Sequence, residues 1–287
     1  MYFKKILLSI LLLIVISIGI WCHIPTRDTI YPSTSFCASR KERRERNRHQ
    51  FPKPHFPPVQ PVQPPVEIIA AIPIRQKSID STNEVYVINL DERKDRMERI
   101  IADFGSTFTI YRTSAVNMTP PQEGCTNSFL RIVKMAKEKG LPTVLIFEDD
   151  NKPEKDFVMN WEQVKIYLDS HMNMWEIFNG GQRYINSIEK TIPLNGVTLT
   201  KPRGGHSANW IYINSNAYDK LLNWETQGKP LIDLWLTGGH FNSWSCYPIL
   251  GLQYNGYSNI NKEERNFDSE DIQVREAYKN LVNNFKG

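Results

Sequence analysis

The chain of 287 residues is poor in cysteine, and its charges are nearly balanced. Its four cysteines, Cys22, Cys37, Cys125 and Cys246, are scattered without metal-ligand spacing, which argues against a zinc site and against a disulfide framework. A single bridge between Cys125 and Cys246 stays open. With 35 Lys and Arg against 31 Asp and Glu, the net charge is +4, so nothing suggests the clustered basic face expected of a nucleic-acid-binding protein.

Long apolar runs are also scarce, and the clearest one lies at the N-terminus. Ile6–Cys22 follows two lysines and is near the lower limit of about 17 residues for a spanning helix. The run ends without a small-x-small cleavage site, which favours an uncleaved anchor over a secretory signal peptide. We expect residues 1–22 to be a cytoplasmic tip and transmembrane signal anchor of a single-pass membrane protein. The expected orientation is type II, with the domain in the ER or Golgi lumen, although the basic residues 40–48 on the other flank compete.

Residues 23–80 have the composition of a stem. The basic run 40–48 is followed by the proline-rich segment 51–73, which favours extended polyproline II and cannot build a packed core. The basic run fits a solvated linker best, with a processing site or a lipid-headgroup contact as alternatives. The globular part is therefore expected over residues 81–287.

Strand-like and helix-like segments alternate in the first half of this domain, over residues 84–181. This alternation predicts an α/β fold with a mostly parallel central sheet flanked by helices, in a single globular domain behind the N-terminal membrane anchor. The second half is less regular. Strands are predicted at 85–88, 108–111, 143–147, 175–178, 210–213 and 246–250, and helices at 92–104, 125–139, from Pro153 onward, 217–224 and 275–285.

Three acids follow the apolar run Thr143–Phe147, namely Glu148, Asp149 and Asp150. In open α/β sheets, ligands bind just beyond the carboxyl ends of the strands. A carboxylate cluster there is costly unless positive charge lies against it, and a divalent cation is the simplest source. The alternative is that the acids start a turn and that Asp150 caps the next helix.

Five blocks stand in order along the domain, namely Tyr86–Arg96, Gly124–Asp150, Gly205–Ile213, Pro230–Asp233 and Gln253–Ile260. Together they resemble glycosyltransferase family 25, which includes lipopolysaccharide and collagen galactosyltransferases. The resemblance covers about residues 84–260, and its specificity comes from the series because no single block is specific. It implies a GT-A-like fold and an inverting transfer of a hexose, with galactose first, from a UDP-sugar to a glycan or glycoprotein. A lipid-linked sugar or a hydroxylated protein side chain is also an expected acceptor.

The resemblance also implies a metal-assisted departure of the nucleoside diphosphate. We assign Asp150, together with Asp149, to a Mn²⁺ or Mg²⁺ ion that neutralises the leaving phosphates. Arg93 and Arg96 are suited to phosphate, or alternatively to surface ion pairs with neighbouring acids. The expected donor-binding residues are Asn89, Leu90, Asp91, Arg93, Arg96, Ser128, Glu148, Asp149, Gly180 and Gly181.

Inverting transfer requires a general base that takes the proton of the acceptor hydroxyl group. Asp233 is the first candidate because it is an acid within an apolar run, and His206, which follows two glycines, is the second. A helix cap or buried ion pair is the alternative for Asp233, and a structural role for His206. Trp210 and Trp235 suit either sugar stacking or the core.

Two positions depart from the family pattern. Phe129 stands where the family usually has histidine, and Asn259 stands where it usually has aspartate. These departures motivate a second interpretation, a catalytically inactive glycosyltransferase-like protein that binds a partner or glycan. A metal-dependent phosphohydrolase is less favoured, because no second metal site or nucleophile is evident.

Overall fold

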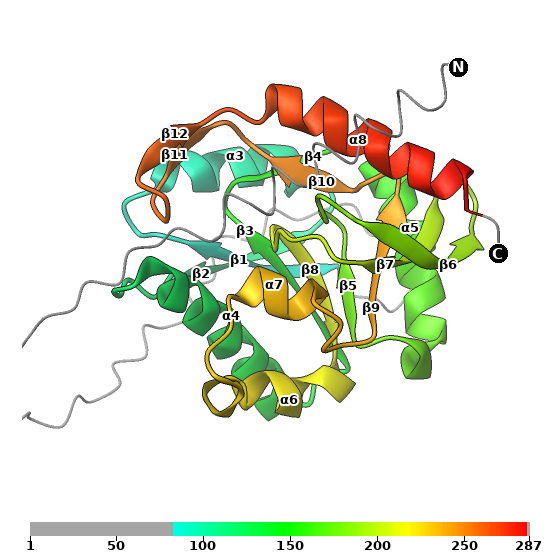
Figure 1. Ribbon diagram of the computed structural model, residues 1–287. Coiled ribbons are helices and arrows are strands. Elements are labelled where there is room, and N and C mark those ends of the chain that lie inside the picture. The colour runs from blue at the N-terminus through cyan, green and yellow to red at the C-terminus, as the bar shows by residue number, and fades with distance from the viewer. Residues whose placement is uncertain (1–82, 286–287) are drawn as a thin grey trace, which may run out of the picture. The chain divides into compact units, whose positions relative to one another are not determined.

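The computed structural model describes residues 83–285, which form a mixed eight-stranded sheet with helices on both faces (Figure 1). The predictions for residues 1–80, a membrane anchor and a stem, fall outside the described residues. Within 83–285 no helix is long and apolar enough to cross a membrane.

The first half of the described chain alternates strands and helices, as the sequence predicts. Their order explains why the first three strands of the sheet lie side by side with helices between them in sequence. The elements are β1 (Glu84–Asn89), α3 (Lys94–Phe104), β2 (Thr109–Ser114), α4 (Pro121–Glu138), β3 (Thr143–Glu148), β4 (Asn151–Pro153), α5 (Phe157–Ser170), a 3-10 turn (Met172–Met174) and β5 (Ile177–Asn179).

The second half has shorter elements and more antiparallel pairs. They are β6 (Ser187–Pro193), β7 (Thr198–Arg203), β8 (Trp210–Asn214), a 3-10 turn (Ser215–Ala217), α6 (Tyr218–Leu222), a 3-10 turn (Trp224–Gln227), α7 (Ile232–Thr237), β9 (Ser243–Tyr247), β10 (Gly251–Gln253), β11 (Gly256–Ser258), β12 (Glu263–Arg265) and α8 (Asp268–Asn283).

The main sheet has the strand order β2-β1-β3-β8-β5-β9-β7-β6. β1 is parallel to β2 and β3, and β5 is parallel to β9. β8 runs antiparallel between β3 and β5, and β7 runs antiparallel between β9 and β6. All strands except β8 and β7 therefore run in one direction, so the predicted mostly parallel sheet flanked by helices is present, with two reversed strands.

The side chains of β1 alternate between two cores, as expected for a strand covered on both faces. Val85 and Val87 face a cluster that includes buried residues of α3 and α5. Tyr86 and Ile88 face the opposite cluster, which includes residues of α4, α6 and α7. α8 packs across a third, smaller cluster through Val274 and Tyr278 (Figure 1).

Asp91 follows β1 and precedes α3, which begins at Lys94, and it pairs with Arg112 and Ser114. One local prediction near the strand ends is wrong. Pro153 does not begin a helix. It ends β4 and pairs with Gly251 of β10 in a separate two-stranded sheet, a position at a strand end where the missing N–H of proline is tolerated.

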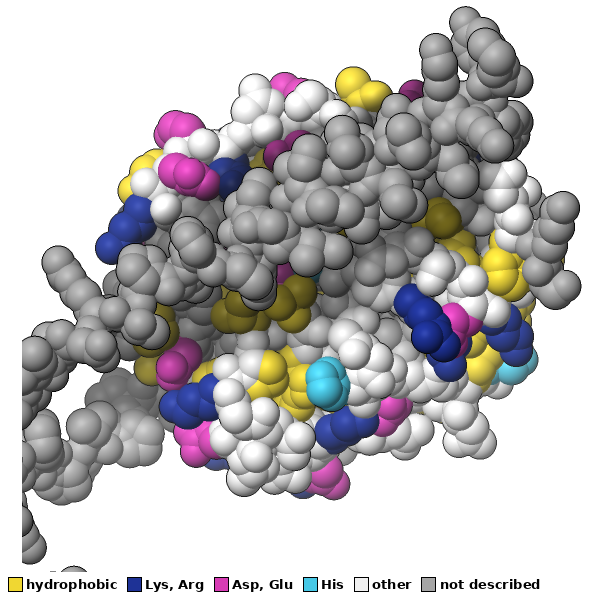
Figure 2. Space-filling view, in the orientation of Figure 1, with side chains coloured by type: hydrophobic (Ala, Val, Ile, Leu, Met, Phe, Trp, Pro, Cys, Tyr) yellow, Lys and Arg dark blue, Asp and Glu magenta, His cyan; other side chains and the backbone are white. Residues whose placement is uncertain are grey.

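Differences in the C-terminal half follow from tertiary packing. Of the strand predicted at 246–250, only the first two residues are in a strand, at the end of β9, and the helix predicted from Arg275 begins earlier, at Asp268. Cys125 and Cys246 are both free thiols, so the open disulfide is absent. Figure 2 shows basic and acidic side chains interspersed over α4 and α6 on the visible face.

Candidate functional site

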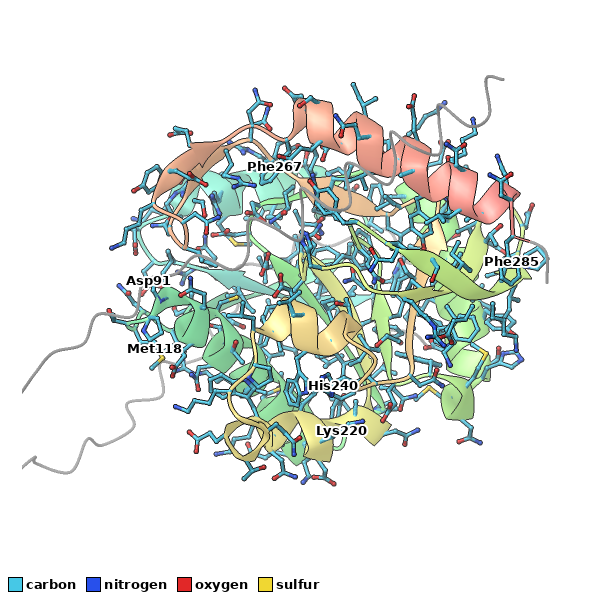
Figure 3. The ribbon with its side chains drawn as sticks, in the orientation of Figure 1. Asp91, Met118, Lys220, His240, Phe267 and Phe285 are labelled. Carbon is cyan, nitrogen blue, oxygen red and sulfur yellow. The ribbon has the colours of Figure 1, made fainter. Side chains whose placement is uncertain are left out.

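A cavity of about 890 Å³ lies beyond the carboxyl ends of β1, β2 and β3. Its wall includes Met118, just before α4, and Phe267, just before α8 (Figure 3). This is the edge of the sheet at which the sequence predicts a ligand. The predicted site residues that line it are Leu90, Arg96, Ser128, Glu148, Asp149, Asp150, His206 and Asp233.

The parallel register of β1 and β3 brings Asn89 beside Asp149. Ile88 pairs with Glu148, so the next residue of each strand lies at the same level. Asn89 Nδ2 donates to Asp149 Oδ2 at 2.8 Å, and Arg96 donates to Asp149 Oδ1 at 2.7 Å. Both oxygens of Asp149 therefore already have partners within the protein.

Asn89 is 2% exposed and does not line the cavity. Its oxygen accepts from Arg112 Nε at 2.9 Å, and its nitrogen also donates to the carbonyl of Arg93 at 3.0 Å. Asn89 therefore acts as an internal brace for Asp149 and for the turn into α3. The predicted direct contact of Asn89 with the donor does not agree with this burial.

Asp150 and Glu148 are short of compensating charge. Asp150 Oδ1 is buried and finds no hydrogen-bond partner among the described residues, while Arg96 lies 3.6 Å from Asp150 Oδ2. Burial and the nearby Asp149 raise the pKa of Asp150 to about 6, against the opposing effect of Arg96. Burial, then repulsion from Asp150, Asp233 and Asp149, raises the pKa of Glu148 to about 8.

Glu148 also accepts a weak hydrogen bond from Cys125, whose sulfur lies 3.7 Å from Glu148 Oε1. Burial, with repulsion from Glu148, raises the pKa of the Cys125 thiol well above its usual value. The thiol is therefore neutral and adds no further negative charge. Three acids from two elements, Glu148 and Asp150 after β3 and Asp233 on α7, thus share a cavity wall in which Arg96 is the nearest cation.

A divalent cation fits Asp150 better than Asp149. The free Asp150 Oδ1 is a hard oxygen ligand, whereas the oxygens of Asp149 are occupied by Asn89 and Arg96. No group of three or more His, Cys, Asp and Glu side chains within 83–285 is arranged to hold a metal. A Mn²⁺ or Mg²⁺ ion at Asp150 would complete its coordination with water and ligand oxygens, as Mg²⁺ sites commonly do.

The two arginines of the turn after β1 hold protein groups. Arg93 pairs with Asp95 and donates to Asn259 Oδ1 at 3.2 Å, and it does not line the cavity. Arg96 donates to the carbonyl of Tyr257 at 2.7 Å as well as to Asp149. The surface ion-pair alternative thus describes Arg93, whereas Arg96 pairs with the buried site acid Asp149, and both arginines connect the start of α3 to the β11–β12 hairpin.

Gly180 and Gly181 are buried packing positions and do not line the cavity. A Cβ on Gly180 would lie 2.7 Å from Trp210 Cδ1, and one on Gly181 would lie 2.3 Å from Asn209 Oδ1. The close approach that these glycines allow is therefore to the protein itself. The structure therefore does not place these two expected donor-binding residues at the cavity.

Ser128 and Asp91 also have internal partners. Ser128 Oγ accepts from the Val116 amide at 2.8 Å and donates to the Gly124 carbonyl at 2.8 Å, which fixes the loop before α4. Asp91 is exposed, lies outside the cavity wall, and pairs with Arg112. Leu90, by contrast, is half-buried and lines the cavity.

Both candidate bases lie in the cavity wall. Asp233 is half-buried in the first turn of α7, where Oδ1 accepts from the Leu234 amide at 2.8 Å. His206 is half-buried and stacks on Tyr184 with ring centroids 4.8 Å apart. Trp210 and Trp235 belong to the core, at 0% and 2% exposed, so neither is a sugar platform.

Sequence reasoning missed a buried asparagine network beneath the cavity. Asn209 Nδ2 donates to Asn151 Oδ1 at 2.9 Å, and Ser207 Oγ donates to Asn209 Oδ1 at 2.7 Å. Asn179 Nδ2 donates to the Ser207 carbonyl at 2.7 Å. All three asparagines are 0% exposed, and the available signal was that Asn179 directly follows one predicted strand and Asn209 directly precedes another.

Comparisons with known proteins leave the family unconfirmed. No protein-family model matches the sequence, and no curated protein matches it. Among solved structures, the chain is similar to a "glycosyltransferase involved in the glycosylation of the major capsid of PBCV-1". That similarity has a TM-score of 0.29 and 11% identity, over 51% of this chain and 67% of that chain. At this level it carries no functional argument, so any assignment must come from the cavity itself.

Proposed function

We propose that the domain over residues 81–287 is a glycosyltransferase of GT-A-like fold. It transfers a hexose, with galactose as the first candidate, from a UDP-sugar to a hydroxyl group of a glycan, lipid-linked sugar or hydroxylated protein. The observation that supports this most is the buried, unpaired Oδ1 of Asp150 in a cavity whose wall also carries Glu148 and Asp233. Such an arrangement favours a cation and the phosphates that accompany it.

The metal assignment is refined by the contacts of the two aspartates. Asp150 would hold a Mn²⁺ or Mg²⁺ ion, which would supply charge neutralisation for the departing diphosphate. Asp149 would orient the site through its hydrogen bonds with Arg96 and Asn89. In this proposal it is no longer a direct ligand of the metal ion. Glu148 would lie next to the ion and contact the sugar or ribose.

The proton of the acceptor hydroxyl group is the remaining requirement. Asp233 lines the cavity from α7. It is distant from Glu148 in sequence but close to it in space, because its charge raises the pKa of Glu148. In an inverting displacement, Asp233 would accept this proton while the acceptor oxygen forms the new bond to the anomeric carbon and the diphosphate leaves. A single-pass anchor with a lumenal domain remains part of the proposal.

The direct test is release of UDP from UDP-sugars by a soluble fragment that begins near residue 78. We expect UDP release that requires Mn²⁺ or Mg²⁺ and that Asp150→Asn abolishes without loss of folding. Asp169→Asn is a matched control, because Asp169 is an acid outside this cavity. A folded protein that neither binds nor cleaves any UDP-sugar would favour the inactive binding protein instead.

The two departures from the family pattern do not themselves support inactivity. Phe129 is 1% exposed in the core beneath α4 and does not line the cavity. Asn259 does line it and accepts from Arg93. The first substitution therefore affects packing, and only the second changes the charge of the cavity.

A further inference from the structure

The cavity has a second wall that carries aromatic side chains. Tyr184 is 45% exposed and lines the cavity together with His206 and Phe267. The rings of Tyr184 and His206 are stacked, with an interplanar angle of 30°. Ligand pockets typically combine such aromatic surface with a few placed polar groups, and here Glu270 and Arg265 line the same wall.

The backbone that presents this pair is strained. Tyr184 has φ +54° and Ser207 has φ +86°. Residues other than glycine rarely adopt this left-handed region. Such a conformation is unfavourable and persists only where the surrounding structure imposes it, commonly at ligand sites. The imposing contact is a two-way backbone bridge, in which Arg183 and His206 each donate to the carbonyl of the other at 3.0 Å.

The Tyr184 ring is also held from outside its own loop. Its hydroxyl group donates to Glu270 Oε2 at 2.6 Å, and Glu270 belongs to α8. The preceding residue, Arg183, is 2% exposed and donates to the buried Asp271 of α8 at 2.7 Å. A ring that is both exposed and fixed loses little conformational freedom when a ligand packs on it.

The chain contains a second stacked Tyr–His pair that serves as an internal reference. Tyr167 and His171 have ring centroids 4.1 Å apart at the end of α5, four residues apart in sequence, and they do not line the cavity. Helical spacing alone explains that pair. Helical spacing does not explain the contact of Tyr184 with His206, because the two residues come from separate segments. Tyr184 itself and Ser207, next to His206, have left-handed backbone conformations.

We propose that Tyr184 and His206 form the subsite for the acceptor and that the acceptor is a carbohydrate. A pyranose ring packs its apolar face on the aromatic pair, and its hydroxyl groups reach Glu270 and Arg265 of the same wall. This inference rests on the proposed function and sharpens it, because it selects a sugar, whether in a glycan or lipid-linked, over a hydroxylated protein side chain as the group bound next to the reacting centre. It also makes His206 a binding residue and leaves Asp233 as the base.

Saturation-transfer NMR with methyl β-galactoside, methyl α-glucoside and methyl β-N-acetylglucosaminide tests the subsite without requiring catalysis. We expect saturation of the ring protons of at least one glycoside by the wild-type protein. The signal should be lost in Tyr184→Asn, because asparagine tolerates the left-handed backbone but lacks the ring. It should persist in Tyr184→Phe and in the control Tyr167→Ala. No signal with the wild-type protein, or an equal signal in Tyr184→Asn, would overturn the proposal.

Hydrolysis of UDP-galactose by water separates this subsite from the donor site. We expect Tyr184→Asn to release UDP at the wild-type rate in the absence of an acceptor, while its KM for a transferable glycoside rises about tenfold. A parallel fall in hydrolysis would place Tyr184 at the donor and overturn the assignment. If the wild-type protein hydrolyses no UDP-sugar, the proposed function fails, and the NMR result still decides whether this wall binds a sugar.

Discussion

The acids that follow β3 and the ion pair beneath α8 both bury charge beside the same cavity, but in opposite ways. Asp271 is 1% exposed, and its Oδ1 is matched by Arg183 at 2.7 Å, although its Oδ2, like Asp150 Oδ1, is buried without a hydrogen-bond partner within 83–285. Asp150 has Arg96 at 3.6 Å as an ion-pair partner, but two further acids lie next to it. The compensated charge stabilises the fold, whereas the incompletely compensated acids leave binding free energy available for a ligand.

The largest expected effect is on stability at the paired site. Asp271→Asn leaves the Arg183 guanidinium buried with only the more distant Glu270, 3.4 Å away, as a charged partner. We expect the free energy of unfolding to fall by about 3 kcal/mol, as is usual when one partner of a buried pair is removed. Urea denaturation measures this, and an unchanged midpoint would show that the pair is not holding α8 in place.

The same substitution at the unpaired site should act in the opposite sense. Asp150→Asn removes a negative charge from beside Glu148 and Asp149, so stability in EDTA should be unchanged or higher. Metal-dependent UDP release should fall at least about 100-fold, because the cation contributes several kcal/mol to such steps. A destabilised but active variant would reverse the comparison.

A smaller effect on stability is expected at Gly181, which packs against Asn209 and Gly251. Gly181→Ala would place a methyl group 2.7 Å from the Gly251 carbonyl oxygen, which cannot move without disturbing β10. We expect a loss of about 1–3 kcal/mol in unfolding free energy, the usual cost of overpacking. The KM for the donor should not change in the folded fraction. An increase in that KM with intact stability would return Gly181 to the donor site.

The smallest expected effect concerns the hairpin that closes the cavity. Asn259→Asp adds a negative charge to the cavity wall and converts the contact with Arg93 into an exposed ion pair. Such pairs contribute less than about 1 kcal/mol. Thermal unfolding and UDP release should therefore stay close to wild type, whereas a large gain in activity would show that the chain has lost a catalytic charge.

The strand and helix order could be predicted because it depends on local apolar periodicity. The same local signal places Glu148 and Asp150 at the end of a central strand and therefore at the cavity. What local signals cannot predict is which partner each side chain meets. Asp149 and Asp150 are adjacent in sequence, yet only the register of β1 and β3 decides that Asp149 meets Asn89.

The glycines and the turn after β1 illustrate the same limit. Gly180 is an expected donor-binding residue, but a Cβ at this position would meet Trp210 of β8, a strand that begins thirty residues later in the sequence. Arg96 reads as a phosphate donor, but α3 places it against Asp149. Tyr184 carries no local signal because its exposure depends on a bridge to His206 and on α8.

The central claim is that Asp150 binds a divalent ion that in turn holds a sugar diphosphate. Isothermal titration of UDP into the soluble domain, with MnCl₂ and with EDTA, for wild type and for Asp150→Asn, tests it most directly. The account predicts that UDP binds the wild-type protein only when Mn²⁺ is present and does not bind Asp150→Asn in either buffer. Equal UDP affinity in EDTA and in MnCl₂, or no binding to the folded wild-type protein, would contradict it.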